Sequence, residues 1–248
     1  MPCAEPDGVD VLAFAPHPDD AEFFCGGTLL VAQKQGHSTA IVDMTDGELA
    51  TNGDDERRNR ERAAAADLLG LSARVSLGLP DGGLRDGDQR AVVVDALREF
   101  RPRVVLAPFG DDRHPDHAAA AQLVRAACFL AGLRRNGGRP HRPTRVYRYM
   151  LHTPFDPAVV VDVTDVWERR RQLLQVFDSQ VTLGPGDVPT ALNGGRFVAM
   201  LEGRAICFGA MAGVTYGEPL QVDGPLLLRG LPECDDDVRP PSGYRSSL

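Results

Sequence analysis

Two turns in the sequence carry histidine and aspartate at helical spacing. The first, His17-Pro18-Asp19-Asp20, follows the apolar run 9–15. If a helix begins near Pro18, a residue that suits the first helical position, His17 and Asp20 share one face. They can then bind a divalent cation and leave Asp19 as a free carboxylate, as metal-assisted hydrolysis requires. Taken alone, the same residues also fit an Asp-rich helix N-terminus with a chance histidine.

The second turn, His114-Pro115-Asp116-His117, has two histidines three positions apart at the start of another predicted helix. Either histidine can join the first turn in a set of three protein ligands, which leaves the fourth position of a catalytic zinc to water. The other histidine, with Asp116 as an orienting carboxylate, can donate to a developing oxyanion. The alternative is simple capping of a surface helix, and the occurrence of two such turns argues against it.

Alternating strand and helix signals predict an α/β fold with a Rossmann-like, mostly parallel sheet and flanking helices. In the first half, the predicted strands cover 9–15, 38–44, 74–77 and 103–107, and the predicted helices cover 21–35, 55–69, 89–100 and 115–130. In the second half, strands are expected over 145–151 and 159–163, helices over 165–177 and 197–210, and a mobile loop over 182–195. By analogy with doubly wound sheets, a strand order of 3-2-1-4 would bring both turns to one crevice. His17 and Asp20 are therefore expected near His114 or His117.

Length and composition limit the class of protein. The 248 residues carry a formal net charge of -8 and predict one domain over 1–231, followed by a poorly ordered tail over 232–248. The acidic balance disfavours nucleic acid and anionic membranes as partners. No apolar run approaches the roughly 20 residues of a membrane helix, and we see no signal peptide. Five scattered cysteines without a CxxC pattern favour a reduced, cytoplasmic protein.

The pattern resembles the LmbE-like, or PIG-L, family of zinc-dependent N-acetylglucosamine deacetylases. The matching residues are Ala15–Asp20, Gly26–Thr28, Thr45–Glu48, Arg58 with Glu61, Leu79–Asp81, Asp112–His117, Asp178–Gln180, Glu202 with Arg204, and Gly213–Glu218. The resemblance covers roughly residues 9 to 228. The Asp-Arg-His-Pro-Asp-His motif and the Tyr-Gly-Glu ending are most similar to the branch that deacetylates N-acetylglucosaminyl malate on the way to bacillithiol.

This resemblance implies a zinc site and a general base. His17, Asp20 and His117 would ligate the zinc ion, with ferrous iron as the alternative metal. Asp19 would take a proton from the zinc-bound water. An amide carbonyl is a poor electrophile, and zinc supplies the reactivity that it lacks by lowering the pKa of water from about 15.7 to about 7.

Further roles follow from the same resemblance. His114, supported by Asp116, would stabilise the oxyanion or protonate the leaving amine, while Arg58 and Asp81 would bind the amino-sugar substrate. Some relatives place a tyrosine hydroxyl over the oxyanion at the position that is Phe197 here, so this chain loses that donor or supplies it elsewhere. Relatives of this branch often form multimers, and a homo-oligomer is expected through the apolar run 197–212.

Three other kinds of function were weighed against this one. A nucleotide-dependent oxidoreductase is disfavoured because the first turn has no GxGxxG motif. A non-catalytic sugar-binding module would not need the spare carboxylate of Asp19. An amidase of thiol conjugates, or a deacetylase of another N-acetylglucosamine derivative or chitooligosaccharide, would use the same core.

The remaining histidines and the single tryptophan have no obvious chemical pattern. His37, His141 and His152 are expected to be surface or capping residues. Trp167 is expected to pack in the core rather than bind a sugar ring.

Overall fold

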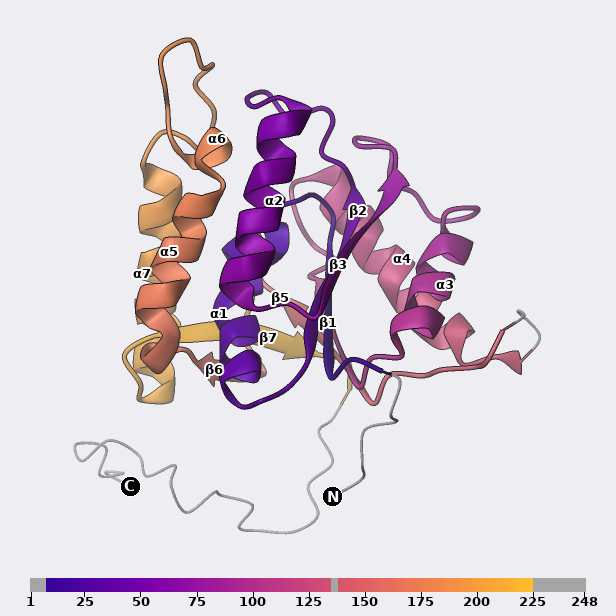
Figure 1. Ribbon diagram of the computed structural model, residues 1–248. Coiled ribbons are helices and arrows are strands. Elements are labelled where there is room, and N and C mark those ends of the chain that lie inside the picture. The colour runs from indigo at the N-terminus through magenta and orange to yellow at the C-terminus, as the bar shows by residue number, and fades with distance from the viewer. Residues whose placement is uncertain (1–7, 135–137, 225–248) are drawn as a thin grey trace, which may run out of the picture.

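The computed structural model describes residues 8–134 and 138–224, which form a seven-stranded sheet with helices on both faces (Figure 1). The strands are β1 (Val11–Ala15), β2 (Thr39–Thr45), β3 (Ala73–Leu79), β4 (Val104–Pro108), β5 (Arg145–Tyr149), β6 (Val159–Asp162) and β7 (Gly217–Val222). The helices are α1 (Asp20–Lys34), α2 (Asp55–Leu69), α3 (Arg90–Phe100), α4 (Pro115–Ala131), α5 (Trp167–Val176), α6 (Asp178–Val181) and α7 (Arg196–Ala212), with a 3-10 turn, η2, at Thr164–Val166. The predicted tail over 232–248 lies outside the described residues.

The strand order is β3-β2-β1-β4-β5-β7-β6. Strand β1 pairs in parallel with both β2 and β4, which confirms the expected order 3-2-1-4. Strand β7 runs antiparallel between β5 and β6. It was not predicted, because Gly217 and Pro219 interrupt the pattern of a strand.

Each face of the sheet has its own apolar core. Helices α1, α2, α5 and α7 cover one face, while α3 and α4 cover the other (Figure 1). Leu12 and Phe14 of β1 contribute to the core under α3 and α4, whereas Ala13 and Ala15 point to the opposite core. Continuous burial of the central strands is typical of parallel sheets that are covered on both sides.

This arrangement brings the starts of two helices to one edge of the sheet. Helix α1 follows the carboxyl end of β1, and α4 follows that of the neighbouring strand β4. At the start of α4, Pro115 occupies the first turn, and Nδ1 of His114 accepts a hydrogen bond from the backbone N–H of Asp116. None of the helices within the described residues has both the length and the apolar character to cross a membrane.

Candidate active site

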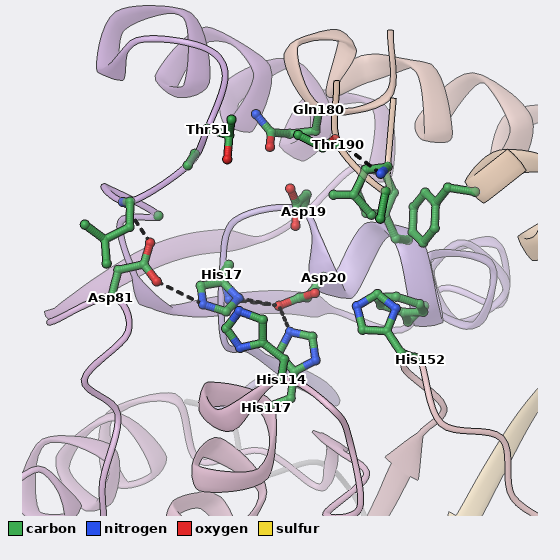
Figure 2. A pocket seen from close by; sticks show the side chains of 18 of the residues that line it. His17, Asp19, Asp20, Thr51, Asp81, His114, His117, His152, Gln180 and Thr190 are labelled. Carbon is green, nitrogen blue, oxygen red and sulfur yellow. Dashed lines mark hydrogen bonds and ion pairs between the residues drawn. The ribbon is translucent and has the colours of Figure 1, made fainter. Parts of the chain in front are cut away.

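A pocket of about 390 Å³ lies at this edge of the sheet (Figure 2), a volume within the usual range for small-molecule sites. The predicted site residues that line it are His17, Asp19, Asp20, Arg58, Asp81, His114 and His117. Asp116 lies behind them and is 1% exposed. The structure therefore brings together residues from four separate segments of the chain.

Three of these residues converge as metal ligands would. The Oδ2 atom of Asp20 lies 3.1 Å from Nδ1 of His17 and 3.3 Å from Nε2 of His117. One ligand atom from each residue lies within 4.8 Å of the other two. Two imidazoles and one carboxylate form a donor set that suits catalytic zinc and leaves a coordination position open. The expected proximity of the two turns is confirmed.

A second set of carboxylates orients the two imidazole rings. The Nε2 atom of His17 lies 3.1 Å from Asp81 Oδ1 and 3.3 Å from Asp116 Oδ2. Similarly, Nδ1 of His117 lies 2.9 Å from Asp112 Oδ1. Such outer carboxylates fix the ring orientation and raise the basicity of the ligating nitrogen. No role had been predicted for Asp112, although it belongs to the second motif.

The carboxylate of Asp116 contacts His17 and not His114, the residue that it was expected to support. It also accepts backbone hydrogen bonds from Gly82 (2.7 Å) and Leu84 (3.1 Å). Its link to His114 is through the backbone, since the N–H of Asp116 donates to Nδ1 of that ring. With Nδ1 as the acceptor, neutral His114 carries its proton on Nε2 and is a hydrogen-bond donor.

Asp19 combines backbone strain with burial. Its φ angle is 127°, a region that non-glycine residues rarely occupy, and its side chain lines the pocket. Strain of this kind often marks a functional position. Burial and the neighbouring charge of Asp20 raise the pKa of Asp19, while Arg58 opposes this shift. Arg58 Nη2 lies 4.0 Å from the Asp19 carboxylate and donates to the carbonyl of Pro18, so it helps to hold the strained turn.

Comparisons with known proteins agree with this geometry. The model of the PIG-L family, GlcNAc-PI de-N-acetylase, matches residues 12–128. Diacetylchitobiose deacetylase from Thermococcus kodakarensis is 29% identical over 229 residues, which cover 85% of this chain and 82% of the relative. The 2'-N-acetylparomamine deacetylase of Streptomyces fradiae is 31% identical over 207 residues, covering 68% of this chain and 72% of the relative. The chain belongs to the PIG-L family.

A solved structure has the same fold. The crystal structure of the conserved protein TT1542 from Thermus thermophilus has a TM-score of 0.82 and 40% sequence identity, covering 91% of this chain and 99% of that protein. Because the similar family members are named deacetylases, this PIG-L protein is an N-deacetylase, a hydrolase of N-acetyl amides. The family resemblance deduced from the motifs is confirmed.

The segment Asp178-Ser179-Gln180 shapes one rim of the pocket. Glu61 of α2 accepts hydrogen bonds from the backbone N–H (2.8 Å) and the hydroxyl (2.7 Å) of Ser179. Gln180 lines the pocket and donates to the carbonyl of Asn52. The Asn52 side chain in turn holds the backbone of Val188 through two hydrogen bonds. The segment 182–195, predicted as a loop, contains no helix or strand and is anchored beside the pocket by these contacts.

The segment Tyr216-Gly217-Glu218 supports helix α1. This helix is kinked at Cys25, where φ is -141°. The backbone N–H groups of Gly27 and Thr28 donate to the Glu218 carboxylate at 2.9 and 2.7 Å. Arg170 also donates to Glu218, at 2.8 Å. Glu218 therefore caps the second half of α1, the helix whose first turn carries Asp20.

His152 was expected to be a surface or capping residue, and this was wrong. It follows β5 and lines the pocket, where its ring stacks on His117 with centroids 5.4 Å apart and planes 16° apart. Burial lowers the pKa of His152 to about 4, so the ring is neutral at pH 7. No local pattern marks His152, but the position of β5 beside β4 could have suggested it. Trp167 packs in the core, as expected.

Proposed function

We propose that this protein hydrolyses the N-acetyl amide of an N-acetylglucosamine-type substrate with a divalent cation held by His17, Asp20 and His117. The observation that carries this proposal is the convergence of these three ligands beside an unligated carboxylate, Asp19. When bound, the cation would polarise the carbonyl and acidify the attacking water. Zinc suits two imidazoles and one carboxylate, and ferrous iron is the alternative that accepts the same donors.

Two residues beside this centre carry out different proton transfers. Asp19 removes a proton from the attacking water, and its raised pKa lets it hold that proton and pass it on. His114, a neutral Nε2–H donor, stabilises the charge that develops on the carbonyl oxygen or protonates the leaving amine. Asp116 acts on both histidine-bearing turns, because its carboxylate contacts His17 and its backbone N–H orients His114.

For the sugar, we propose contacts with Arg58 and Asp81. Both line the pocket, although each already has protein partners. Arg58 contacts the turn at Asp19, and the Asp81 oxygens contact His17 and the backbone N–H of Leu49. These contacts hold the two side chains in place before substrate arrives. A sugar hydroxyl can add to them because a carboxylate oxygen accepts more than one hydrogen bond.

The preferred substrate that we propose is N-acetylglucosaminyl malate, in bacillithiol biosynthesis. The supporting feature is Arg113, which lines the pocket, is exposed, and has no acidic partner among residues 8–134 and 138–224. A guanidinium binds a carboxylate well through two hydrogen bonds. An aglycone that carries carboxylates would meet this cation, whereas a neutral disaccharide such as diacetylchitobiose would gain nothing from it.

The test is release of primary amine from N-acetylglucosaminyl malate and from diacetylchitobiose, by zinc-loaded and EDTA-treated protein. We expect metal-dependent release and a preference for the malate glycoside, which Arg113→Ala reduces while leaving turnover of the neutral sugar intact. Equal turnover of both substrates by the wild type would refute the malate assignment alone. Zinc-loaded protein that releases amine from neither would refute hydrolysis of this class of substrate.

We also propose a homo-oligomer formed through α7. This helix exposes Met200, Ile206 and Met211, which are 37%, 48% and 67% exposed. Exposed apolar side chains grouped on one element often mark a protein interface. Light scattering at micromolar concentration should give a multiple of the chain mass, and Ile206→Glu should shift it toward the monomer. A wild-type monomer would contradict the proposal.

A further inference from the structure

One side of the pocket is closed by three rings, Phe24, His152 and Phe197, here called the aromatic wall. Phe24 meets His152 at 5.4 Å and 85°, and Phe197 at 6.0 Å and 77°, while His152 and Phe197 are 6.3 Å apart between ring centroids. Near-perpendicular contacts of this kind are favourable and fix the rings relative to one another. Phe24 and Phe197 are each only 5% exposed, so the wall is a packed surface.

The aromatic wall has a defined position relative to the candidate metal ligands. His152 stacks on His117 at 5.4 Å, and His114 stacks on the same ring at 4.6 Å. Figure 2 shows His114 and His152 on opposite sides of His117, with Asp81 further out on the side of His114. The pocket therefore has a polar side and an aromatic side, with the ligand set between them.

The amine side and the acyl side of the substrate amide require different surroundings. The leaving amine must lie near His114 if this residue protonates it, and the sugar attached to that amine carries hydroxyls that need hydrogen-bond partners. Asp81 supplies polar atoms on that side of the pocket. The acyl carbon chain leaves the carbonyl in the other direction, needs no polar partner, and gains from apolar contact.

We propose that the aromatic wall is the acyl subsite and that it restricts the enzyme to acetyl and similarly short acyl groups; this rests on the proposed function. Phe197 is backed by Phe23, which is 1% exposed and lies 5.3 Å away between ring centroids. A longer chain would have to displace packed core residues, which is unfavourable. Since one methylene in an apolar pocket is worth about 10–200-fold in specificity, kcat/KM should fall steeply from acetyl to butyryl.

The test compares N-acetyl, N-propionyl and N-butyryl forms of one amino sugar by amine release. In Phe24→Ala and Phe197→Ala, the ratio of kcat/KM for butyryl to that for acetyl should rise at least about tenfold. The matched control is Leu49→Ala. Leu49 also lines the pocket, but its side chain is 68% exposed and its backbone N–H contacts Asp81 on the polar side, so this variant should keep the wild-type ratio.

The outcomes distinguish failure of the acyl subsite from failure of the proposed deacetylation. Thermal unfolding and metal content show whether each variant is folded and contains its metal. If Phe197→Ala does not fold, Phe197→Leu, which leaves a smaller void, takes its place. Phe197→Leu should accept the propionyl substrate. Folded, loaded variants that keep the wild-type ratio would overturn the acyl subsite while leaving deacetylation intact, as would a change of ratio in Leu49→Ala. A wild type that releases no amine from any of the three substrates would overturn both.

Discussion

Two clusters of buried charged residues in this protein differ in their balance of positive and negative charge. The first, here called the ion-pair cluster, joins Glu22, Asp43, Arg62 and Arg74 between helices α1 and α2 and strands β2 and β3. Arg74 donates to both oxygens of Asp43 at 2.8 and 2.9 Å and also contacts Glu22. Arg62 approaches Asp43 to 3.1 Å. Two guanidinium groups thus match two carboxylates.

The second cluster surrounds the candidate metal centre. Its carboxylates belong to Asp19, Asp20, Asp81, Asp112 and Asp116, and they lie around the imidazoles of His17 and His117. Arg58 is the buried guanidinium beside them. Unpaired buried charge is costly, so such a site needs protons or a metal cation to balance it. Balanced charge fits a role in stabilising the fold, whereas excess negative charge fits the binding of a cation.

The largest expected effect is on catalysis, and it distinguishes the role of Asp19 in the second cluster from the binding of the cation. Asp19→Asn keeps the size of the side chain but removes the general base, so kcat should fall by about 10²–10⁴-fold while zinc content stays at the wild-type level. Steady-state amine release and metal analysis measure the two quantities. Asp46→Asn is the control, because Asp46 is a half-exposed partner of Arg62. Loss of zinc from Asp19→Asn would show that Asp19 is a ligand and contradict the assignment.

The next effect tests the balanced cluster. Arg74→Met leaves Asp43 and Glu22 buried with reduced compensation, so the free energy of unfolding should fall by about 3–5 kcal/mol. Arg60→Met is the matched control, since Arg60 pairs with Glu56 on the surface of α2, and such a pair contributes at most about 1 kcal/mol. Urea unfolding measures both variants. If folded Arg74→Met lost its zinc, the two clusters would not be separate units.

A smaller effect concerns the outer carboxylates. Asp112→Asn removes the charge that orients His117, and metal affinity should fall by about 10–100-fold. Asp111→Asn, an exposed neighbour in sequence, should leave the affinity unchanged. Competition with a zinc chelator measures the dissociation constant. Unchanged affinity in Asp112→Asn would mean that this carboxylate holds the backbone of His152 and Thr153 without influencing the metal.

The convergence of the two histidine-bearing turns was predictable from the sequence, whereas contacts between distant segments were not. The proposed metal ligands follow strand ends, so strand order and helical spacing predicted His17 and Asp20 near His114 or His117. The family resemblance then selected His117. The sequence pattern paired Asp116 with His114 because both lie in the same turn, but the carboxylate of Asp116 contacts His17 across the crevice. His152 was misjudged because nothing near it in sequence indicates a site. Such contacts depend on how distant segments pack, which local patterns do not encode.

The last expected effect, smallest for each single pH unit, is the coupling of metal binding to protons. In the metal-free protein, burial lowers the pKa of His117, but the charge of Asp20 and the contact with Asp112 raise it to about 9. A raised pKa means that the ring is protonated at pH 7, and a cation must displace that proton before it can bind. Zinc affinity should therefore fall by at least about tenfold for each pH unit below 9. Chelator competition at pH 6.5, 7.5 and 8.5 measures the slope of zinc affinity against pH.

This slope should be shallower in Asp112→Asn, because the pKa of His117 is then lower. A pH-independent affinity would imply that the ring is already neutral, and the excess negative charge around it would not have the influence described here.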